Sequence, residues 1–388
     1  MGLQGTNQEW GRPYNRRIVL EAIRLDGPTT RGRIAERVGL TVQTVSTIIR
    51  ELEDLGLVLS VRAEPKGRGY PPAALRINPD GGFAIGVHVT PLGIDTGLVN
   101  LAGDVIATAT RAATHVSPEE GFTLIAECAA ELRRYRPDGR LLGAGLALPG
   151  PFDVDSMSFV GPTTLSGWAN VPLADRLAEA TGLPAFIEVD SAASAHGERL
   201  YGRGAEFSQF YYLFFGVGLG GVMVADGTVE RGAFGNAGEI GHIPVMPGGE
   251  PCPCGNRGCL ERYVSLEAYL RRPAGMPLKS WIEGVAPVFS AAIQTIENLY
   301  DPATIILGGL APPDLIEGFA ALAETLGNSV SARRGRTHPR LLVSDGGKNT
   351  VLRGAAALAV QGVLSPSFDQ MRRSPGPGTS DLLKGLAA

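Results

Sequence analysis

The sequence predicts a multi-domain protein of mixed α+β and α/β class: a winged helix-turn-helix at the N-terminus, then a two-lobed α/β body with a structural zinc site. Three observations predict this class. Short helical apolar stripes separated by glycines come first, strands and helices alternate from residue 83 onward, and a histidine and three cysteines gather within residues 242–259.

The domain boundaries are predicted at turn-rich breaks. We expect the winged helix-turn-helix over residues 1–79, ending at the Asn78–Gly82 turn sequence. The first α/β lobe is expected over 80–200, joined by a helix near 348–363, and the second lobe, with the zinc loop and a ligand cleft, over 201–347. The Ser-, Pro- and Gly-rich tail over 364–388 is expected to be flexible.

Composition and charge limit the class of protein. Of the 388 residues 44% are hydrophobic and 19% charged, as in ordinary globular proteins. No apolar run reaches the ~18–20 residues that span a bilayer, and the first residues lack a signal-peptide pattern, so a cytoplasmic location is expected. Residues 1–80 hold twelve Lys and Arg against nine Asp and Glu; this net charge of +3 leaves −7 for the remainder. A basic head on an acidic body suits a nucleic-acid-binding module.

Three helices and a wing are predicted in the head. Apolar residues at helical spacing run from Tyr14 to Leu25, and Thr29 or Thr30 can cap a second helix that stops at Gly39. Thr41 can cap a third helix. Two short strands then flank a basic, glycine-rich tip, and these are Leu57–Val61 and Ala74–Ile77. This order is that of a winged helix-turn-helix.

The residues expected to contact DNA lie on the outer face of the third helix and in the wing. Glutamine can bond adenine, hydroxyls can bond phosphates or base edges, and basic side chains suit the phosphate backbone. The predicted contacts are Gln43, Thr44, Ser46, Thr47 and Arg50 on the helix, and Lys66 and Arg68 in the wing, with Arg31 and Arg33 nearby. The segment Thr44–Val58 resembles the winged helices of bacterial regulators. The alternative is a small helical protein-interaction domain with solvated charges.

A zinc site is predicted in the loop after Gly238. One imidazole and three thiolates complete a tetrahedral Zn²⁺ shell with no open position, which makes the site structural. The ligands are His242, Cys252, Cys254 and Cys259, and one ion is expected per chain. The alternative is three free thiols. The fourth cysteine, Cys128, and the strand histidine His88 are expected to be packed inward.

The body resembles a known family. Residues 83–360 are similar to the ROK family of repressors, open reading frames and sugar kinases, which has an actin/hexokinase-like (ribonuclease H-like) fold. The motifs that carry the resemblance are Gly238-Glu-Ile-Gly-His242, Cys252-x-Cys-Gly-x-x-Gly-Cys-Leu-Glu261, Gly216–Gly221, Asp226-Gly227, Leu148-Pro-Gly150 and Asp301-Pro302 with Gly308-Gly309. A winged helix before a ROK body is the layout of the sugar-responsive regulators of that family.

The resemblance implies roles for individual residues. His242 would use one nitrogen for zinc and the other for a sugar hydroxyl, and Glu239 and Glu261 would face the same sugar. Asp190 matches the acid that takes the hydroxyl proton in the kinases; here it is a vestigial base position, and no catalytic residue is expected. Gly150 and Thr164 complete the implied ligand-binding set.

The departures from the family pattern favour a sensor over an enzyme. The kinase Asp-x-Gly-Gly-Thr turn, which wraps ATP phosphates through backbone N–H groups, is His88-Val-Thr-Pro-Leu92 here. Amides that are expected around Asp190 and before the Leu165 turn are replaced by Val189, Ala192 and Thr164. Phosphoryl transfer depends on positioned phosphates, so it should be lost.

Three functions remain open from the sequence. The favoured one is a transcriptional regulator, most simply a repressor, that binds operator DNA and a sugar or sugar derivative, with no membrane partner. Since operators have two-fold symmetry, a homodimer or higher homo-oligomer is expected. The alternatives are an ATP-dependent carbohydrate kinase that retains a DNA-binding head, and a metal-stabilised DNA-binding protein with a vestigial cleft.

Overall fold

The computed structural model describes residues 12–61, 73–114, 116–153, 158–159, 165, 167–331, 335–365 and 373–374. The chain divides into two compact units. Unit 1 comprises Met1–Leu146, Pro172–Ile187 and Ala355–Ala388, and unit 2 comprises Ala147–Val171 and Glu188–Gly354. The chain therefore passes from one unit to the other after Leu146, Val171, Ile187 and Gly354.

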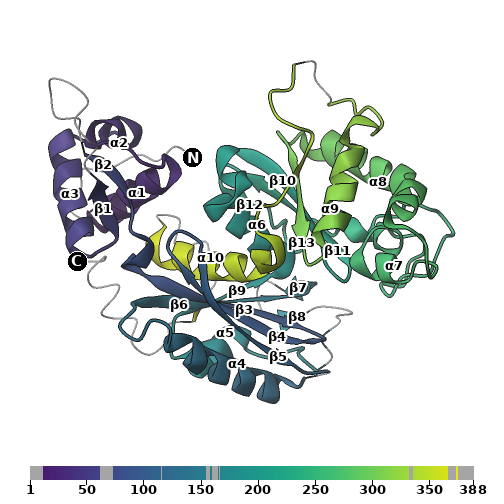
Figure 1. The fold of residues 1–388 in the computed structure, drawn as a ribbon, viewed down its shortest axis with the longest axis horizontal. Helices are drawn as coiled ribbons and strands as arrows, with labels where there is room; N and C mark the ends of the chain where they lie inside the picture. Colours follow the sequence, from purple (N-terminus) through teal and green to yellow (C-terminus); the bar gives the residue numbers. More distant parts are fainter. Residues whose placement is uncertain are drawn as a thin grey trace. The chain divides into compact units, whose positions relative to one another are not determined.

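The N-terminal part of unit 1 is the predicted winged helix-turn-helix (Figure 1). Its elements are α1 (Arg12–Leu25), α2 (Arg31–Val38), α3 (Val42–Asp54), β1 (Val58–Val61) and β2 (Ala74–Ile77), and β1 pairs antiparallel with β2. Thr30 caps α2 by accepting from the Arg33 amide, and Gly39 ends it in the left-handed region (φ 66°). Thr41 caps α3. The apolar stripes of the three helices, including Ile18, Ile34 and Ile49, are fully buried.

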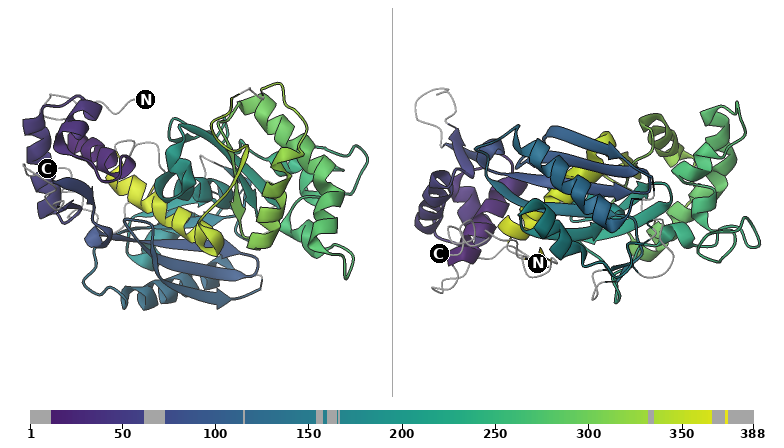
Figure 2. Two further views of the ribbon diagram at one scale, coloured as in Figure 1. Left: turned by 45° about the horizontal axis from the view of Figure 1, so that its top comes forward. Right: turned by 90° about the horizontal axis from the view of Figure 1, so that it is seen from below.

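The rest of unit 1 is built on a six-stranded sheet of order β15-β9-β6-β3-β4-β5. Its strands are β3 (Phe83–Thr90), β4 (Gly93–Asn100), β5 (Val105–Ala112), β6 (Leu141–Leu148), β9 (Ala185–Val189) and β15 (Arg373–Ser374). Figures 1 and 2 show α4 (Pro118–Arg133) and α5 (Leu173–Thr181) on one face and α10 (Thr350–Leu364) on the other. α10 approaches β6 closely because Gly145 has no Cβ; one there would lie 1.8 Å from the Ala355 carbonyl oxygen.

Unit 2 is built on a five-stranded sheet of order β12-β11-β10-β13-β14. Its strands are β10 (Gln209–Phe215), β11 (Leu219–Ala225), β12 (Thr228–Val229), β13 (Ile305–Gly309) and β14 (Leu341–Val343). The helices α6 (Asp190–Tyr201) and α8 (Leu278–Tyr300) cover opposite faces (Figure 1), with α7 (Leu266–Leu270) and α9 (Pro313–Ala320) beside α8. Phe215, Phe289 and Phe319 form the centre of the core under α8.

Several predicted elements are confirmed with small shifts, and others are additional. The sequence pattern predicts a strand over residues 103–108, and the structure has it over 105–112. It also predicts a largely helical stretch over 266–300, which in the structure is interrupted between α7 and α8. The elements α9, β12 and β14 have no counterpart among the predictions. A short hairpin of β7 (Phe152–Asp153) and β8 (Ser158–Phe159) follows β6.

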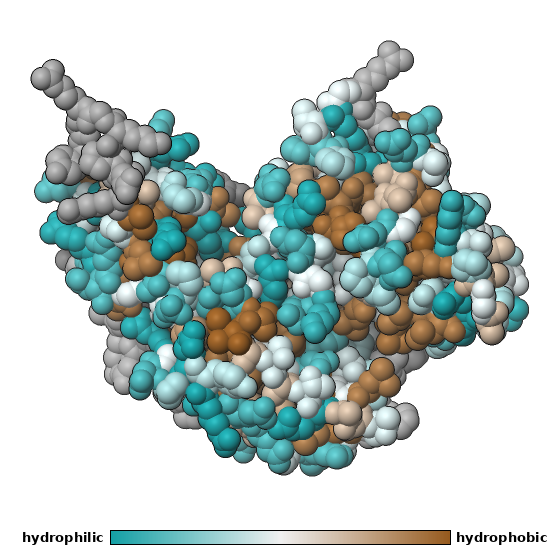
Figure 3. All heavy atoms as spheres, in the orientation of Figure 1, coloured by the Kyte–Doolittle hydropathy of each residue, from teal (hydrophilic) through white to brown (hydrophobic). Residues whose placement is uncertain are grey.

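The exposed surface of the described residues mixes hydrophilic and hydrophobic side chains, as Figure 3 shows for one face. Among the described residues, no helix combines the length and apolar character that a membrane crossing requires.

Candidate functional site

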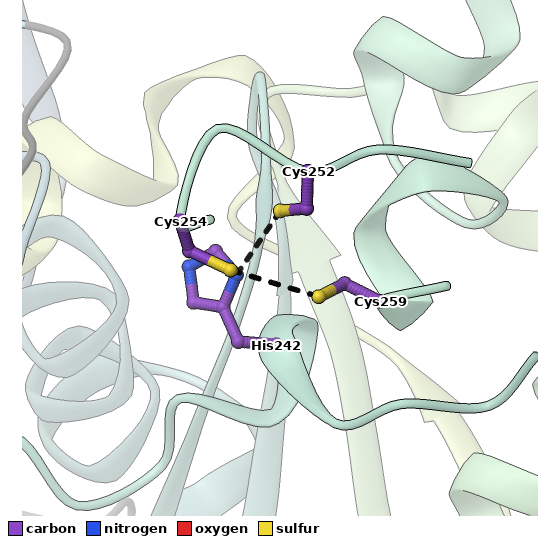
Figure 4. Close-up of side chains that lie close together, drawn as sticks. All are labelled: His242, Cys252, Cys254 and Cys259. Atoms are coloured by element: carbon purple, nitrogen blue, oxygen red, sulfur yellow. Dashed lines mark hydrogen bonds between the residues drawn. The ribbon is translucent and has the colours of Figure 1, made fainter. Parts of the chain in front are cut away.

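Four side chains of types that can bind a metal converge in unit 2 (Figure 4). His242 ends a 3₁₀ turn over Ile240–His242, and the three cysteines follow in the irregular loop before a second 3₁₀ turn, Leu260–Arg262. One ligand atom from each of His242, Cys252, Cys254 and Cys259 lies within 4.8 Å of every other. Cys252 Sγ is 3.6 Å from His242 Nδ1, and Cys254 Sγ is 3.7 Å from Cys259 Sγ.

These separations fit one tetrahedral ion. With Zn–S bonds of about 2.3 Å and Zn–N bonds of about 2.0 Å, tetrahedral angles place two sulfurs about 3.8 Å apart and a sulfur and nitrogen about 3.5 Å apart. A disulfide would need about 2.0 Å, so the 3.7 Å between Cys254 and Cys259 excludes one. The donor set and its spacing therefore fit a closed metal shell.

The loop that carries the ligands is held by close backbone approaches. The Cys252 amide donates to the Asn256 carbonyl (2.9 Å), and the Val245 amide donates to the Gly258 carbonyl (2.9 Å). Gly258 has φ 76°, and a Cβ there would lie 1.7 Å from the Met246 carbonyl oxygen. Glycine is needed at this point, since neither the conformation nor the space admits a side chain.

Two carboxylates flank the imidazole. Glu261 Oε1 lies 3.5 Å from His242 Nδ1 and 3.1 Å from Cys252 Sγ, whereas Glu239 Oε2 lies 3.8 Å from His242 Nε2. The two ring nitrogens therefore face different groups: Nδ1 faces the thiol cluster, and Nε2 faces Glu239. This arrangement leaves one side of the ring for a metal and the other for a ligand.

Gly150 and Asp190 follow the carboxyl ends of β6 and β9, and both residues belong to unit 2. Asp190 starts α6 directly after β9, and its Oδ1 accepts from the Ser191 amide at 2.7 Å. Burial raises the pKa of Asp190 to about 7; the Ser191 hydrogen bond opposes the shift and the Glu239 charge adds to it. A Cβ on Gly150 would lie 3.5 Å from Glu239 Oε1. The structure thus brings Gly150, Asp190, Glu239, His242 and Glu261 together, while Thr164 lies outside the described residues.

The glycine-rich stretch before and within β11 supports this group. A Cβ on Gly218 would lie 2.7 Å from Glu261 Oε2, and one on Gly220 would lie 3.0 Å from Ser191 Cβ. The Gly221 amide donates to the Gly238 carbonyl at 3.0 Å, immediately before Glu239. At these glycines the close approaches are to side chains and backbone of the protein itself.

Sequence reasoning missed two further residues near the site. Arg231 forms an ion pair with Glu188, two residues before Asp190, and its Nε lies 3.1 Å from Glu188 Oε2. Val189 was noted only as a departure from a family motif, yet its Cγ1 would lie 3.4 Å from a Cβ on Gly150. Its position between two acids, at the end of β9 and just before α6, was the available signal.

The residues predicted to contact DNA lie on the outer side of α3. Gln43, Thr44, Thr47 and Arg50 are exposed and Ser46 is partly exposed. Intrahelical bonds hold several of them: the Ser46 hydroxyl donates to the Val42 carbonyl (2.7 Å), and the Thr47 hydroxyl donates to the Gln43 carbonyl (3.2 Å). Arg31 and Arg33 start α2. Lys66 and Arg68 lie outside the described residues.

The segment His88–Leu92 runs into a tight hairpin. Thr90 pairs with Gly93, which leaves only Pro91 and Leu92 at the tip, and Leu92 is 71% exposed. His88 is buried as predicted, its Nε2 has no hydrogen-bond partner among the described residues, and burial lowers its pKa to about 4. Cys128 is also fully buried, as predicted.

The fold and the site define a DNA-binding transcription regulator with a ligand-binding α/β body. A winged helix-turn-helix DNA-binding model matches residues 13–58, and the ROK family model matches residues 84–362. The chain belongs to the ROK family.

Curated relatives include both regulators and kinases. The chain is 25% identical over 381 residues to the xylose repressor of Bacillus spizizenii, covering 92% of this chain and 97% of the relative. It is 28% identical to the xylose repressor of Bacillus subtilis over 68% of this chain and 69% of the relative. A glucokinase of Halalkalibacterium halodurans is 34% identical over 48% of this chain and 58% of the relative.

Among solved structures, a ROK family transcriptional regulator described as a homologue of the E. coli MLC protein matches with a TM-score of 0.70. The match covers 97% of this chain and 99% of that chain at 22% identity, so it supports the fold alone.

Proposed function

We propose that this protein is a repressor that binds operator DNA through α3 and the wing and is controlled by a sugar or sugar derivative bound at the Asp190–Glu239–His242–Glu261 group. One observation carries the proposal: a DNA-binding head and a ROK body occur in one chain, matched over 92% of its length by a xylose repressor. The exposed Gln43, Thr44 and Arg50 support the DNA-binding role.

Fluorescence anisotropy with the promoter region of the protein's own gene tests DNA binding at moderate salt. The Gln43→Ala/Thr44→Ala variant should lose specific binding about tenfold or more, since base contacts contribute about 1–3 kcal/mol each. Lys279→Ala, which removes a largely exposed charge on α8, is the matched control. Absence of site-specific binding by the wild-type protein would overturn the proposal.

The effector is proposed from the chemistry of the site. Carboxylates at Asp190, Glu239 and Glu261 accept hydrogen bonds from neighbouring hydroxyls, which suits a polyhydroxylated ligand. Thermal-shift scanning with xylose, hexoses, amino sugars and polyols should find a stabilising sugar, and that sugar should change operator affinity. Stabilisation by none of them would favour a vestigial site.

The four-donor cluster is proposed to hold one structural Zn²⁺. Its ligand spacing fits tetrahedral coordination, and all four positions are protein donors, so no position is open for catalysis. The ion would fix the loop between Glu239 and Glu261 and thereby the positions of both carboxylates. It is proposed to brace the site rather than to react.

Phosphoryl transfer is proposed to be absent. The hairpin tip at Pro91 and Leu92 has no glycine and one amide fewer, which leaves no backbone cradle for phosphates at this turn. The resemblance to the kinases implies that Asp190 is a vestigial base position, and burial raises its pKa. An ATP-coupled assay over the same sugars should show no turnover; turnover that Asp190→Asn abolishes would establish the kinase alternative.

A homodimer is proposed from the symmetry of operators. A single winged helix reads one half-site, and two-fold operators need two heads at fixed spacing. Sedimentation with and without operator DNA tests this; a monomer in both conditions would contradict it.

A further inference from the structure

The first residue of α3 exposes an apolar side chain on the helix that would read DNA. Val42 is 53% exposed, although the valine one turn later, Val45, is fully buried in the core of the head. In a helix-turn-helix, here α2 and α3, the second helix enters the major groove, and its N-terminal residues contact the base edges. The Val42 side chain therefore lies where the first base contacts of α3 are expected.

The hydroxyl groups next to Val42 donate their hydrogens within the helix. Ser46 Oγ donates to the Val42 carbonyl at 2.7 Å. Thr47 Oγ1 donates to the Gln43 carbonyl at 3.2 Å. The major-groove edge of guanine consists of acceptors alone, N7 and O6, so a protein needs free donors to bind it. These two hydroxyls offer no free hydrogen for that purpose.

Charged donors for guanine are also missing from the first two turns of α3. The commonest guanine contact is a bidentate Arg or Lys, and residues 42–49 contain neither. Arg50 follows in the third turn, where its Nε donates to the Ser46 carbonyl at 3.3 Å and so engages its own helix. The exposed amide of Gln43 remains, and glutamine bonds adenine through N6 and N7.

An exposed valine beside this glutamine suits an A·T pair. Thymine is the base that presents a C5-methyl group in the major groove, and apolar side chains contact that methyl. Contact between Val42 and a thymine methyl removes apolar surface of both groups from water, which is favourable. The same valine against cytosine would cover the N4 amino group without offering it an acceptor, which is costly.

We propose that Val42 is a specificity-determining residue: it contacts the methyl group of a thymine, beside an adenine bonded by Gln43, so that the start of α3 reads neighbouring A·T pairs in each half-site. This inference rests on the proposed function, because it assumes that α3 lies in the major groove of an operator. Val42 is not among the residues that the sequence predicts to contact DNA, since an apolar side chain carries no hydrogen-bonding signal.

Replacement of thymine by uracil in the operator tests the inference, because uracil pairs as thymine does and lacks only the methyl group. Duplexes that bind the full-length protein are first selected from a random library, and each thymine of the selected site is then replaced singly. Replacement at one position per half-site should weaken binding by the wild-type protein about fourfold, the effect of one buried methyl group. Fluorescence anisotropy at constant salt measures the affinities.

Variants of two neighbouring residues separate the two base contacts. Val42→Ala should bind the selected site about fivefold more weakly, should bind the thymine and uracil duplexes equally, and should keep the salt dependence of the wild-type protein. Gln43→Ala should instead become insensitive to 7-deazaadenine, which lacks the N7 acceptor. Val330→Ala, at a valine that is 97% exposed in unit 2, is the matched control and should keep the full response to uracil.

The outcomes distinguish the role of Val42 from operator binding itself. A selected site in which no thymine methyl matters, or a uracil effect that Val42→Ala retains, would overturn the role of Val42 while operator binding stands. A selection that enriches no sequence would overturn the proposed operator binding, and the role of Val42 with it.

Discussion

Arg140 donates a hydrogen bond from Nη1 to the carbonyl oxygen of Leu55 at 2.9 Å. Leu55 is the C-cap of α3, and Arg140 immediately precedes β6. The Asn78 side chain reinforces the link by donating to the Gly56 carbonyl at 2.7 Å. Terminal carbonyls of a helix lack intrahelical partners, so these contacts tie the end of the proposed recognition helix to the sheet of the body.

We predict that Arg140→Ala weakens communication between sugar and operator. The factor by which the effector changes operator affinity should fall about fivefold, since a hydrogen bond from a charged donor that is also solvated contributes about 1 kcal/mol. Anisotropy titrations with and without the effector measure the factor. Arg134→Ala, at an exposed arginine that caps α4, is the control. An unchanged factor in Arg140→Ala would remove this link from the mechanism.

His88 should make unit 1 sensitive to acid. Its pKa falls from 6.5 to about 4 because burial disfavours the charged ring, an effect that Asp95 partly opposes. The folded state therefore binds fewer protons than the unfolded state between these values, so stability is full above pH 6.5 and falls as pH drops toward 4. Across the whole window, this shift changes the free energy of unfolding by about 3 kcal/mol.

The non-titrating variant His88→Gln should flatten that part of the pH dependence. Thermal unfolding midpoints between pH 4.5 and 8 provide the comparison, and the wild-type curve should drop more steeply on the acid side. Because Asp190 titrates in the opposite sense over a similar range, only the difference between the two proteins is diagnostic. Parallel curves would show that folding does not shift the pKa of His88.

The zinc content of the protein should depend on an intact cysteine cluster. Wild-type protein is expected to contain about one zinc per chain, and Cys254→Ser less than about 0.2, with a lower unfolding midpoint and loss of the sugar response. Cys128→Ala, at the buried cysteine outside the cluster, should keep its zinc. Metal analysis and calorimetric sugar titration give the two readouts. A stable, responsive protein without metal would show that the cluster is not a zinc site.

Two glycines of unit 2 should respond to alanine in opposite ways. At Gly221 a Cβ would lie 2.1 Å from the buried Tyr211 hydroxyl, so Gly221→Ala should destabilise by about 1–3 kcal/mol and weaken sugar binding. At Gly284, exposed within α8, nothing lies within 4 Å, so Gly284→Ala should stabilise by about 0.5–1 kcal/mol. Thermal unfolding measures the stability change in each variant. Equal shifts of the unfolding midpoint in the two variants would contradict the packing described for β11.

The head and the cluster of one histidine and three cysteines could be predicted because their signals are local. The caps Thr30 and Thr41 and the stop at Gly39 act within one helical turn, and the four donors fall within eighteen residues of one another. By contrast, β14 is a three-residue strand whose partner, β13, lies more than thirty residues earlier, and no periodicity of its own marks it.

The rest of the site depends on contacts distant in sequence. That Gly150 approaches both Val189 and Glu239 is a property of the folded unit, since these residues come from three separate segments. The family resemblance named Gly150 and Glu239 but treated Val189 as a missing amide. In the structure, the Val189 side chain approaches Gly150, and the Val189 amide donates a hydrogen bond to the Glu188 carboxylate.

The candidate ligand residues lie close in sequence to the points where the chain passes between the two units. β6 and β9 each begin in unit 1 and end in unit 2, and the chain changes unit after Leu146 and Ile187. Gly150 comes four residues after the first joint, and Asp190 comes three residues after the second. The two candidate ligand residues therefore lie within a few peptide bonds of the points where the chain changes unit, so a ligand bound to them would act directly on the backbone beside both crossings.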